Sequence, residues 1–498
     1  MKKNNAGYIL SFDQGTTSSR AILFNHEGQL IAEEQKEFTQ YYPESGWVEH
    51  DAEEIWKTQL SVAQGVIQKA GIEAKNIVSI GITNQRETVV VWDKDSGKPV
   101  YKAIVWQCRR STKICEDLSS AGLEDEFKNR TGLRLDPYFS GTKLCWLFRE
   151  IPGLKALAEN GEILFGTIDS WLLWKLTGRH VTDITNASRT LLFNIHEKKW
   201  DTVLLSILGI PPQVLPEVLS SSDNFGVTKK EIFGCNIPVT GVLGDQQAAL
   251  FGHTCFAPGT VKNTYGTGCF TLLNTGENPI ASHNNLLTTV AWKINNKVTY
   301  ALEGSVFIAG AVIQWLRDEM HILTNAAESE RLAQAVPNSN GVYLVPAFVG
   351  LGAPYWDPDA RGAIVGITRG VTREHIVRAA LESIAFQSVD LLDAMCADYG
   401  KAITVLKADG GATANSFLMQ FQADIAGIPV LLPEITEITA LGAAYMAGLY
   451  CGYWNDMQEI EAIWQMKCQF EPNMKEKERK SRMKLWHSAV SATREYKQ

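Results

Sequence analysis

The sequence lacks the features of several protein classes. Its nine cysteines include no Cys-x-x-Cys pair and have no histidine at zinc-ligand spacing, which argues against a disulfide framework or structural zinc and favours a reducing cytoplasm. The longest uncharged stretches, near residues 304–316 and 341–356, contain Gly, Pro or Gln and are too short to span a membrane. The apolar run near the N-terminus is broken at Asp13, too early for a signal peptide. We therefore expect a soluble cytoplasmic protein without stable membrane insertion.

An excess of positive charge is also missing. Lys and Arg number 47 against 55 Asp and Glu, which gives a formal net charge of −8 and argues against binding to nucleic acid or anionic membranes. Phosphate binding stays open, because backbone amides and a magnesium ion can supply a local positive field. A chain of 498 residues is too long for one core, so we expect two to four domains.

A glycine-rich loop near the N-terminus has no helix after it. Residues 13–20 lie between two predicted strands, 8–12 and 21–24, whereas a Walker loop or dinucleotide fingerprint requires a helix directly after the glycines. The segment therefore predicts a hairpin that holds phosphate with amides and hydroxyls. The pattern recurs at 260–264 and 269–273, which indicates an internal duplication. For either hairpin alone, an ordinary Gly/Thr turn is the simpler interpretation.

Strands and helices alternate along the rest of the chain, which predicts an α/β fold with mixed sheets. The tail after residue 471 is rich in Lys and Glu, with Trp486 and Val490 on one face; we interpret it as a solvated surface helix. Further expected strands are 30–33, 76–82, 89–92 and 403–407, and expected helices are 52–70, 139–150, 374–399 and one from about 415.

Two carboxylates follow predicted strands. Residues 238–251 predict a buried strand, a short polar segment that begins at Asp245, and a second apolar segment. Asp13 directly follows the predicted strand 8–12. A carboxylate near phosphates requires a divalent cation between them, so both residues could converge on one magnesium ion. The alternative is an Asp that caps an ordinary turn.

The pair Arg86-Glu87 interrupts an apolar β region without a neighbouring Gly or Pro. A neutral ligand rich in hydroxyls needs such a mixture of donors and acceptors; the alternative is an exposed salt pair. Tyr138 adds a polar group, and Trp106 and Phe270 could form apolar walls against a carbon chain.

Two glycine–amide pairs could contact a purine. Gly410-Gly411 lies between a strand and a helix, where the missing Cβ lets a flat ring approach the backbone, and Asn415 follows one turn later. Gly310 and Gln314 are four apart on a predicted helix. Glycines that allow close helix packing are the simpler alternative for each pair.

Assembled, these motifs resemble the FGGY carbohydrate kinase family of the actin/sugar-kinase/Hsp70 ATPase superfamily, over essentially the whole chain. The resemblance implies two duplicated ribonuclease-H-like (actin-like ATPase) domains, 1–253 and 254–498, around a central cleft. Family members that act on xylulose, ribulose or gluconate lack the Asn-Gln-Arg-Glu-Thr run, which favours glycerol as the substrate. The motifs are FDQGTTSSR (12–20), GITNQRET (81–88), FSGTKLCWL (139–147), GDQQAALFG (244–252), NTYGTGCF (263–270), GSVFIAGAVIQWL (304–316) and DGGATANSFLMQFQAD (409–424).

The resemblance also implies an activity, ATP-dependent phosphorylation of glycerol to sn-glycerol 3-phosphate as the first step of glycerol catabolism. Asp245 is then the catalytic base, and Asp13 and Asp245 hold Mg²⁺. The implied glycerol-binding residues are Arg86, Glu87, Trp106, Tyr138, Asp245, Gln246 and Phe270. The implied nucleotide-binding residues are Thr16, Thr17, Ser18, Arg20, Thr267, Gly310, Gln314, Gly411 and Asn415.

Alternatives remain open at this stage. One is a family kinase for another small polyol, triose or sugar, and a more remote one is an ATP-driven switch like actin or an Hsp70 nucleotide domain. The resemblance further implies a homo-oligomer, a dimer or a tetramer. Residues 228–238 contain neither the Arg nor the His that regulated relatives use for fructose bisphosphate binding or phosphorylation, which argues against both controls.

Overall fold

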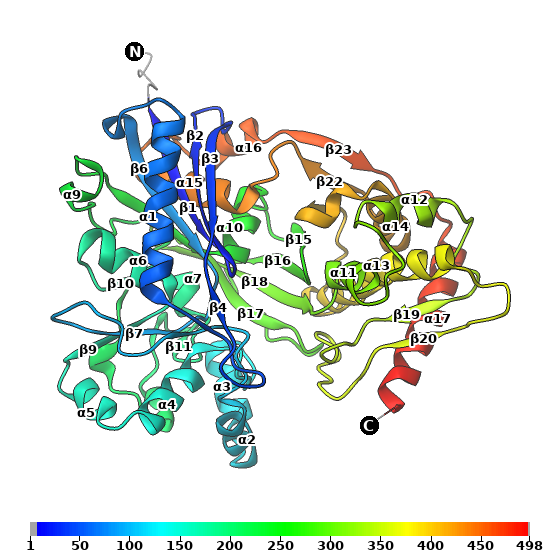
Figure 1. Cartoon of the computed structure of the whole chain (residues 1–498), viewed down its shortest axis with the longest axis horizontal. Coiled ribbons are helices and arrows are strands. Elements are labelled where there is room, and N and C mark those ends of the chain that lie inside the picture. The colour runs from blue at the N-terminus through cyan, green and yellow to red at the C-terminus, as the bar shows by residue number, and fades with distance from the viewer. Residues whose placement is uncertain (1–6, 497–498) are drawn as a thin grey trace.

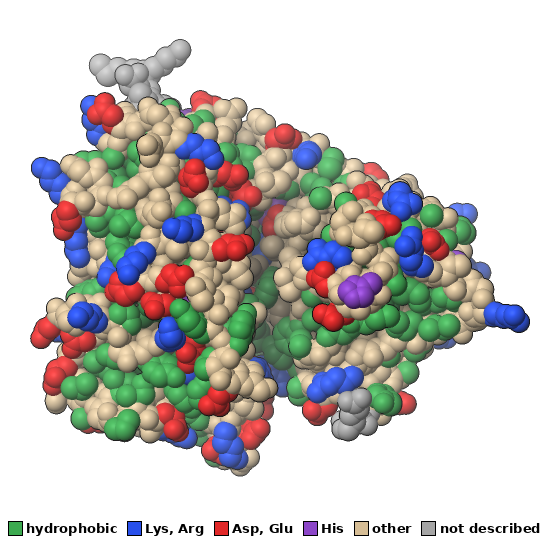
Figure 2. Space-filling model, in the orientation of Figure 1, with side chains coloured by type: hydrophobic (Ala, Val, Ile, Leu, Met, Phe, Trp, Pro, Cys, Tyr) green, Lys and Arg blue, Asp and Glu red, His purple; other side chains and the backbone are tan. Residues whose placement is uncertain are grey.

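Two β-sheets, one from each half of the chain, form the frame of this computed structural model, which describes residues 7–496. The halves form two lobes that lie side by side (Figure 1), and a deep hollow separates them (Figure 2). The first sheet has the order β14-β6-β1-β2-β3. Its strands are β1 (Tyr8–Gln14), β2 (Ser18–Phe24), β3 (Leu30–Glu37), β6 (Ile77–Asn84) and β14 (Val239–Gly244).

The second sheet repeats the arrangement of the first, with the order β17-β18-β16-β15-β21-β22-β23. In each sheet an antiparallel hairpin, β1–β2 or β15–β16, has an antiparallel neighbour on one side and two parallel strands on the other. This repetition confirms the predicted duplication. The strands are β15 (Val261–Tyr265), β16 (Cys269–Gly276), β17 (Leu287–Ile294), β18 (Lys297–Val306), β21 (Leu406–Asp409), β22 (Val430–Pro433) and β23 (Met466–Phe470).

Helices cover both faces of the first sheet. Residues of α1 (Ala52–Lys69) and α6 (Ile168–Thr177) share one apolar core with the sheet, and α10 (Asp245–Gly252) and α15 (Ile438–Tyr450) share another. Although α15 belongs to the second half of the sequence, it packs against β1, β6 and β14 of the first sheet (Figure 1). A Cβ at Gly81 would lie 2.2 Å from the carbonyl oxygen of Ala443, so this packing requires glycine.

The remaining elements complete the two lobes. In the first half these are β4 (Gln40–Tyr41), β5 (Glu49–His50), β7 (Val90–Asp93), β8 (Ala103–Ile104), α2 (Thr112–Ser120), α3 (Glu124–Thr131), α4 (Ser140–Glu150), α5 (Leu154–Glu159), β9 (Ile163–Gly166), β10 (Val181–Asp183), α7 (Ile184–Ala187), β11 (Phe193–Asn194), β12 (Lys199–Trp200), α8 (Thr202–Leu208), β13 (Glu217–Leu219) and α9 (Lys230–Phe233). In the second half they are α11 (Gly310–Asp318), α12 (Glu328–Gln334), β19 (Tyr343–Val345), β20 (Ala363–Val365), α13 (Arg373–Tyr399), α14 (Ser416–Ala426), α16 (Met457–Ile463) and α17 (Glu476–Glu495).

The predicted helices and strands are present, with shifted ends. The first hairpin is longer than predicted, because β1 continues through Asp13 to Gln14 and β2 begins at Ser18. The prediction of a solvated C-terminal helix is wrong for one face of α17: Trp486 and Val490 are buried in the core of the second lobe. None of the helices within residues 7–496 is long and apolar enough to cross a bilayer.

Candidate active site

Asp245 lies where a buried strand meets a helix. It is the first residue of α10 and follows the last residue of β14 directly. Its Oδ1 accepts a hydrogen bond of 2.7 Å from the backbone N–H of Gln246, and a helix N-terminus favours a negative charge. The side chain is 32% exposed and lies 3.1 Å from Arg86 Nε. The carboxylate is therefore held by one hydrogen bond and one ion pair, yet is open to a ligand.

Arg86 and Glu87 follow β6 and are almost fully buried, at 3% and 1% exposure. This rules out the exposed salt pair weighed for them. Glu87 itself makes the turn, with a φ of 60°, which explains why no glycine or proline marks the site. A left-handed conformation costs free energy at a residue with a side chain, so the surrounding contacts must hold Glu87 in place.

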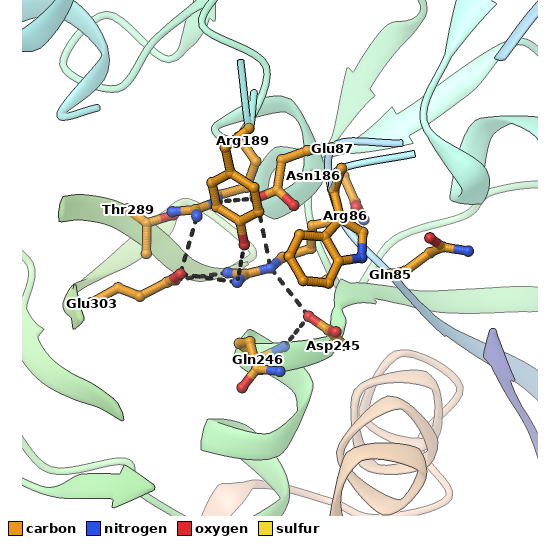
Figure 3. Close-up of polar contacts among 12 residues, drawn as sticks. Gln85, Arg86, Glu87, Asn186, Arg189, Asp245, Gln246, Thr289 and Glu303 are labelled. Carbon is orange, nitrogen blue, oxygen red and sulfur yellow. Dashed lines mark hydrogen bonds and ion pairs between the residues drawn. The ribbon is translucent and has the colours of Figure 1, made fainter. Parts of the chain in front are cut away.

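A network of two arginines and two glutamates supplies those contacts (Figure 3). Glu303, on β18, accepts from Arg86 Nη1 at 2.7 Å and Nη2 at 2.9 Å. Arg189 donates from Nε to Glu87 at 2.7 Å and from Nη2 to Glu303 at 3.0 Å. Such bidentate, charge-assisted bonds define the orientation of each side chain. The network joins the first half of the chain, through Arg86, Glu87 and Arg189, to Glu303 of the second.

The arginines of this network outweigh burial at Glu303 but not at Glu87. Burial opposes ionisation of Glu303, but Arg189 and Arg86 outweigh it and lower the pKa of Glu303 to about 2. For Glu87 burial is the larger effect and raises its pKa, although Arg86 and Arg189 oppose the rise. Burial raises the pKa of Tyr138 as well. Glu303 is therefore ionised at neutral pH and holds both guanidinium groups.

The predicted pocket residues lie around this network. Tyr138 OH is 3.5 Å from Arg86 Nη2, and the Tyr138 ring stands edge-on to Trp106 with centroids 5.5 Å apart. Gln246 follows Asp245 on α10 and is nearly buried. Phe270, on β16, is half-buried and is connected to Gln246 through Lys262, whose Nζ reaches the Phe270 carbonyl oxygen at 3.1 Å and Gln246 Oε1 at 2.5 Å. The structure thus brings the polar groups and the Tyr138 and Trp106 rings to one place, and the Phe270 backbone is connected to it through Lys262.

The first hairpin adjoins this pocket. Trp106 Nε1 donates to Thr16 Oγ1 at 3.0 Å, and the exposed Thr17 completes the turn, which the Gly15 N–H closes onto the Ser18 carbonyl oxygen at 3.0 Å. Arg20 is paired with Glu437, a residue 417 positions away. The hydroxyls and amides of the turn are thus placed beside the pocket.

The nucleotide residues predicted in the second half lie around its own hairpin. Gly310 N–H donates to the Gly266 carbonyl oxygen at 3.0 Å, which sets the start of α11 against the exposed Thr267; Gln314, one turn onward, is also exposed. Gly411 has open space where a Cβ would be. Asn415 caps α14, with Oδ1 accepting from the Leu418 N–H at 2.9 Å.

Asp13 is the second carboxylate of the site. Burial raises its pKa to about 6, with Arg20 opposing and Asp245 adding to the rise. Asp13 and Asp245 lie at the same edge of the first sheet, since β1, β6 and β14 are parallel. Within residues 7–496 no group of three or more His, Cys, Asp or Glu side chains could hold a metal. A two-carboxylate arrangement suits Mg²⁺, which often binds one or two carboxylates together with substrate phosphates.

Sequence reasoning missed three buried charges of the site: Arg189, Lys262 and Glu303. Each is a lone charged residue in an otherwise apolar or uncharged segment, and charged side chains are almost never buried unless they are paired. An isolated charge in the predicted strand 260–264 at Lys262, and in the uncharged run around Glu303, was the available signal.

Comparison with known proteins identifies the class. The N-terminal domain of the FGGY family of carbohydrate kinases matches residues 8–252, and the C-terminal domain of that family matches residues 261–451. The fold and the site therefore define a two-domain carbohydrate kinase with the predicted duplicated, actin-like α/β architecture. The chain belongs to the FGGY family of carbohydrate kinases.

Relatives are similar over nearly the whole chain. A glycerol kinase from Thermoanaerobacter sp. (strain X514) is 59% identical over 97% of this chain and 98% of its own, and glycerol kinase 2 from Thermotoga maritima is 58% identical over the same shares. The crystal structure of Plasmodium falciparum glycerol kinase with ADP covers 98% of both chains with a TM-score of 0.93 and 38% identity. A xylulose kinase from Lactobacillus acidophilus, at 23% identity and a TM-score of 0.88, shares the fold.

Proposed function

We propose that this chain transfers the γ-phosphoryl group of ATP to glycerol and yields sn-glycerol 3-phosphate. The observation that carries the proposal is the Asp245 carboxylate, held by Arg86 at 3.1 Å beside buried donors, acceptors and aromatic rings. This mixture suits a small, neutral, hydroxyl-rich acceptor. The glycerol kinases that resemble the chain at 58% and 59% identity support glycerol over other polyols.

Each group of site residues has its own role in the reaction. Asp245 accepts the proton of the attacking hydroxyl as general base, while Arg86, Glu87, Tyr138 and Gln246 orient the hydroxyls and Trp106 and Phe270 contact the carbons. Amides and hydroxyls of the two hairpins stabilise the charge that develops on the transferred group. The nucleotide is held by two groups of residues: Thr16, Thr17, Ser18 and Arg20 from the first half, and Thr267, Gly310, Gln314, Gly411 and Asn415 from the second.

Asp13 and Asp245 are the residues that would hold Mg²⁺. When bound, the ion would neutralise phosphate charge, which a carboxylate pair alone would repel. We further propose two domains, 1–253 and 254–498, a cytoplasmic location and a homo-oligomer. Arg86, Glu87, Arg189 and Glu303 pair with one another within one chain.

ADP release by the purified chain tests the proposal, measured with ATP and Mg²⁺ and a panel of acceptors: glycerol, dihydroxyacetone, erythritol, xylulose or none. We expect release that depends on glycerol, with glycerol 3-phosphate as the product. Strong activity with another acceptor would reassign the pocket around Arg86 while keeping the nucleotide site. ATP turnover indifferent to every acceptor would contradict the kinase assignment and favour an ATP-driven switch.

A further inference from the structure

A buried ammonium group lies behind the proposed glycerol pocket. Lys262, on β15, is fully buried, and its Nζ donates to Gln246 Oε1 at 2.5 Å, Thr264 Oγ1 at 2.9 Å and the Phe270 carbonyl oxygen at 3.1 Å. All three donors of the ammonium group are thus used. Across the described residues 7–496, no carboxylate forms an ion pair with it. Burying an ammonium without an ion pair is costly, so the three neutral partners require an explanation.

Two of these partners belong to the proposed pocket, Gln246 and Phe270. A lysine ammonium can only donate, so it must face the oxygen of the Gln246 amide and not its nitrogen. The Gln246 Nε2 group is thereby turned away from Lys262, and within the described part of the chain it donates to no other residue. Gln246 is left with two free donors and with its acceptor already engaged.

We infer that Lys262 is a positioning residue for the phosphoryl acceptor, a role that rests on the proposed function. It fixes the amide orientation of Gln246 so that this side chain offers only donors to a glycerol hydroxyl. The hydroxyl oxygen then accepts from Gln246, and its own proton must point to an acceptor. The adjacent carboxylate of Asp245 supplies one.

The charge on Lys262 is consistent with this role. Burial lowers its pKa to about 8, and the nearby carboxylates of Asp409, Asp245 and Glu303 oppose the fall while Arg86 adds to it. Lys262 is therefore an ammonium at neutral pH. Strand β15 belongs to the second lobe, whereas α10 packs on the first sheet. The hydrogen bond from Lys262 to Gln246 therefore also connects the second lobe to the first.

A matched control exists on the neighbouring strand. Lys407 is the direct partner of Lys262 in the β15–β21 ladder, and its Nζ also reaches the end of α10, donating to the His253 carbonyl oxygen at 2.6 Å and to Thr254 Oγ1 at 3.0 Å. It touches neither Gln246 nor Phe270. Lys407→Met therefore removes a comparable tether without disturbing the pocket.

Steady-state kinetics of the full chain test the inference. We expect Lys262→Met to raise KM for glycerol about tenfold or more, with kcat and KM for ATP changed by less than about threefold, and Lys407→Met to leave KM for glycerol unchanged. In a Gln246→Leu background, Lys262→Met should have almost no further effect, since the two act as one unit. The same fold-change in both backgrounds, a parent-like Lys262→Met, or an equal KM rise in Lys407→Met would overturn the inference.

Gln246→Glu keeps the test decisive if Lys262→Met does not fold. A carboxylate there gives Lys262 an ion-pair partner but offers no donor to glycerol, so we expect thermal stability at or above that of the parent with KM for glycerol raised about tenfold or more. A normal KM would overturn the donor role. If the parent itself released no ADP in response to glycerol, the proposed function would fail, and the inference with it.

Discussion

At the scale of single residues, the site depends on one partly open carboxylate among buried charges. Asp245 is held by Arg86 and by a backbone N–H, so a change from carboxylate to amide can keep its shape while removing its basicity. A substitution of this kind therefore tests proton transfer with little change in the size of the side chain.

We expect Asp245→Asn to lower kcat by roughly 10²–10⁴-fold and to leave nucleotide affinity nearly unchanged, because an amide cannot accept the hydroxyl proton. Turnover by steady-state kinetics and ADP affinity by calorimetry measure the two effects. Asp117→Asn, which removes an exposed carboxylate on α2 that pairs with Lys113, is the control. Near-normal turnover in Asp245→Asn would exclude Asp245 as the base.

Another residue gives the protein a pH-dependent stability. His50 is buried, and burial lowers its pKa to about 4, well below about 6.5 in an unfolded chain. Between these values the unfolded state binds more protons, so the free energy of unfolding falls as the pH drops from 6.5 towards 4. At pH 4 the titration of His50 has lowered the free energy of unfolding by about 2–3 kcal/mol.

His50→Gln removes this titration and should flatten the pH dependence in that window. Urea unfolding of the parent and of the variant at pH 7.5, 6, 5 and 4 provides the comparison. Parallel curves for the two proteins across the window would show that His50 is protonated in the native state as readily as in the unfolded one.

At the scale of elements, α17 shows how a charged segment can be part of a core. Its Trp486 ring stacks on Phe386 of α13, with centroids 5.3 Å apart, and its Nε1 donates to Asp390 at 2.7 Å. Trp486→Ala should lower the free energy of unfolding by about 3–5 kcal/mol. Leu485→Ala, at a neighbouring position that is 51% exposed, should change it by less than about 0.5 kcal/mol. Equal effects in chemical denaturation would mean that α17 does not stabilise the lobe.

The sequence predicted elements better than tertiary partners. Hydrophobic periodicity and turn residues located the two hairpins and the predicted helix 374–399, which is α13 in the structure. These signals are local in the sequence. The burial of Trp486 was missed because Lys and Glu dominate the local composition of α17, whereas its apolar partners lie about 100 residues earlier. For the same reason Glu303 escaped notice as the partner of Arg86. The contacts of Asp245 and Tyr138 with Arg86 fit the pocket that the motifs indicated.

At the scale of the molecule, the network of two arginines and two glutamates connects the halves. Glu303 on β18 holds Arg86 and Arg189 from the first half. Glu303→Ala would leave two buried guanidinium groups short of a counterion, so we expect the free energy of unfolding to fall by about 3–5 kcal/mol and glycerol-dependent turnover to be lost. Glu476→Ala, which removes an exposed ion pair with Lys480, should leave the free energy of unfolding almost unchanged. Calorimetry would contradict this expectation if both variants melted like the parent.

The position of α15 has a consequence for how the protein is made. This helix covers the first sheet, and the carbonyl oxygen of its Ala440 accepts from Ser11 Oγ at 2.7 Å, 429 residues earlier in the chain. During synthesis on a ribosome, strands β1 and β2 emerge long before residues 438–450. Apolar side chains such as Ile22 and Phe24, which end in the core shared with α15, therefore have no complete cover until nearly the whole polypeptide exists. We therefore expect the nascent first half to expose apolar surface that chaperones bind.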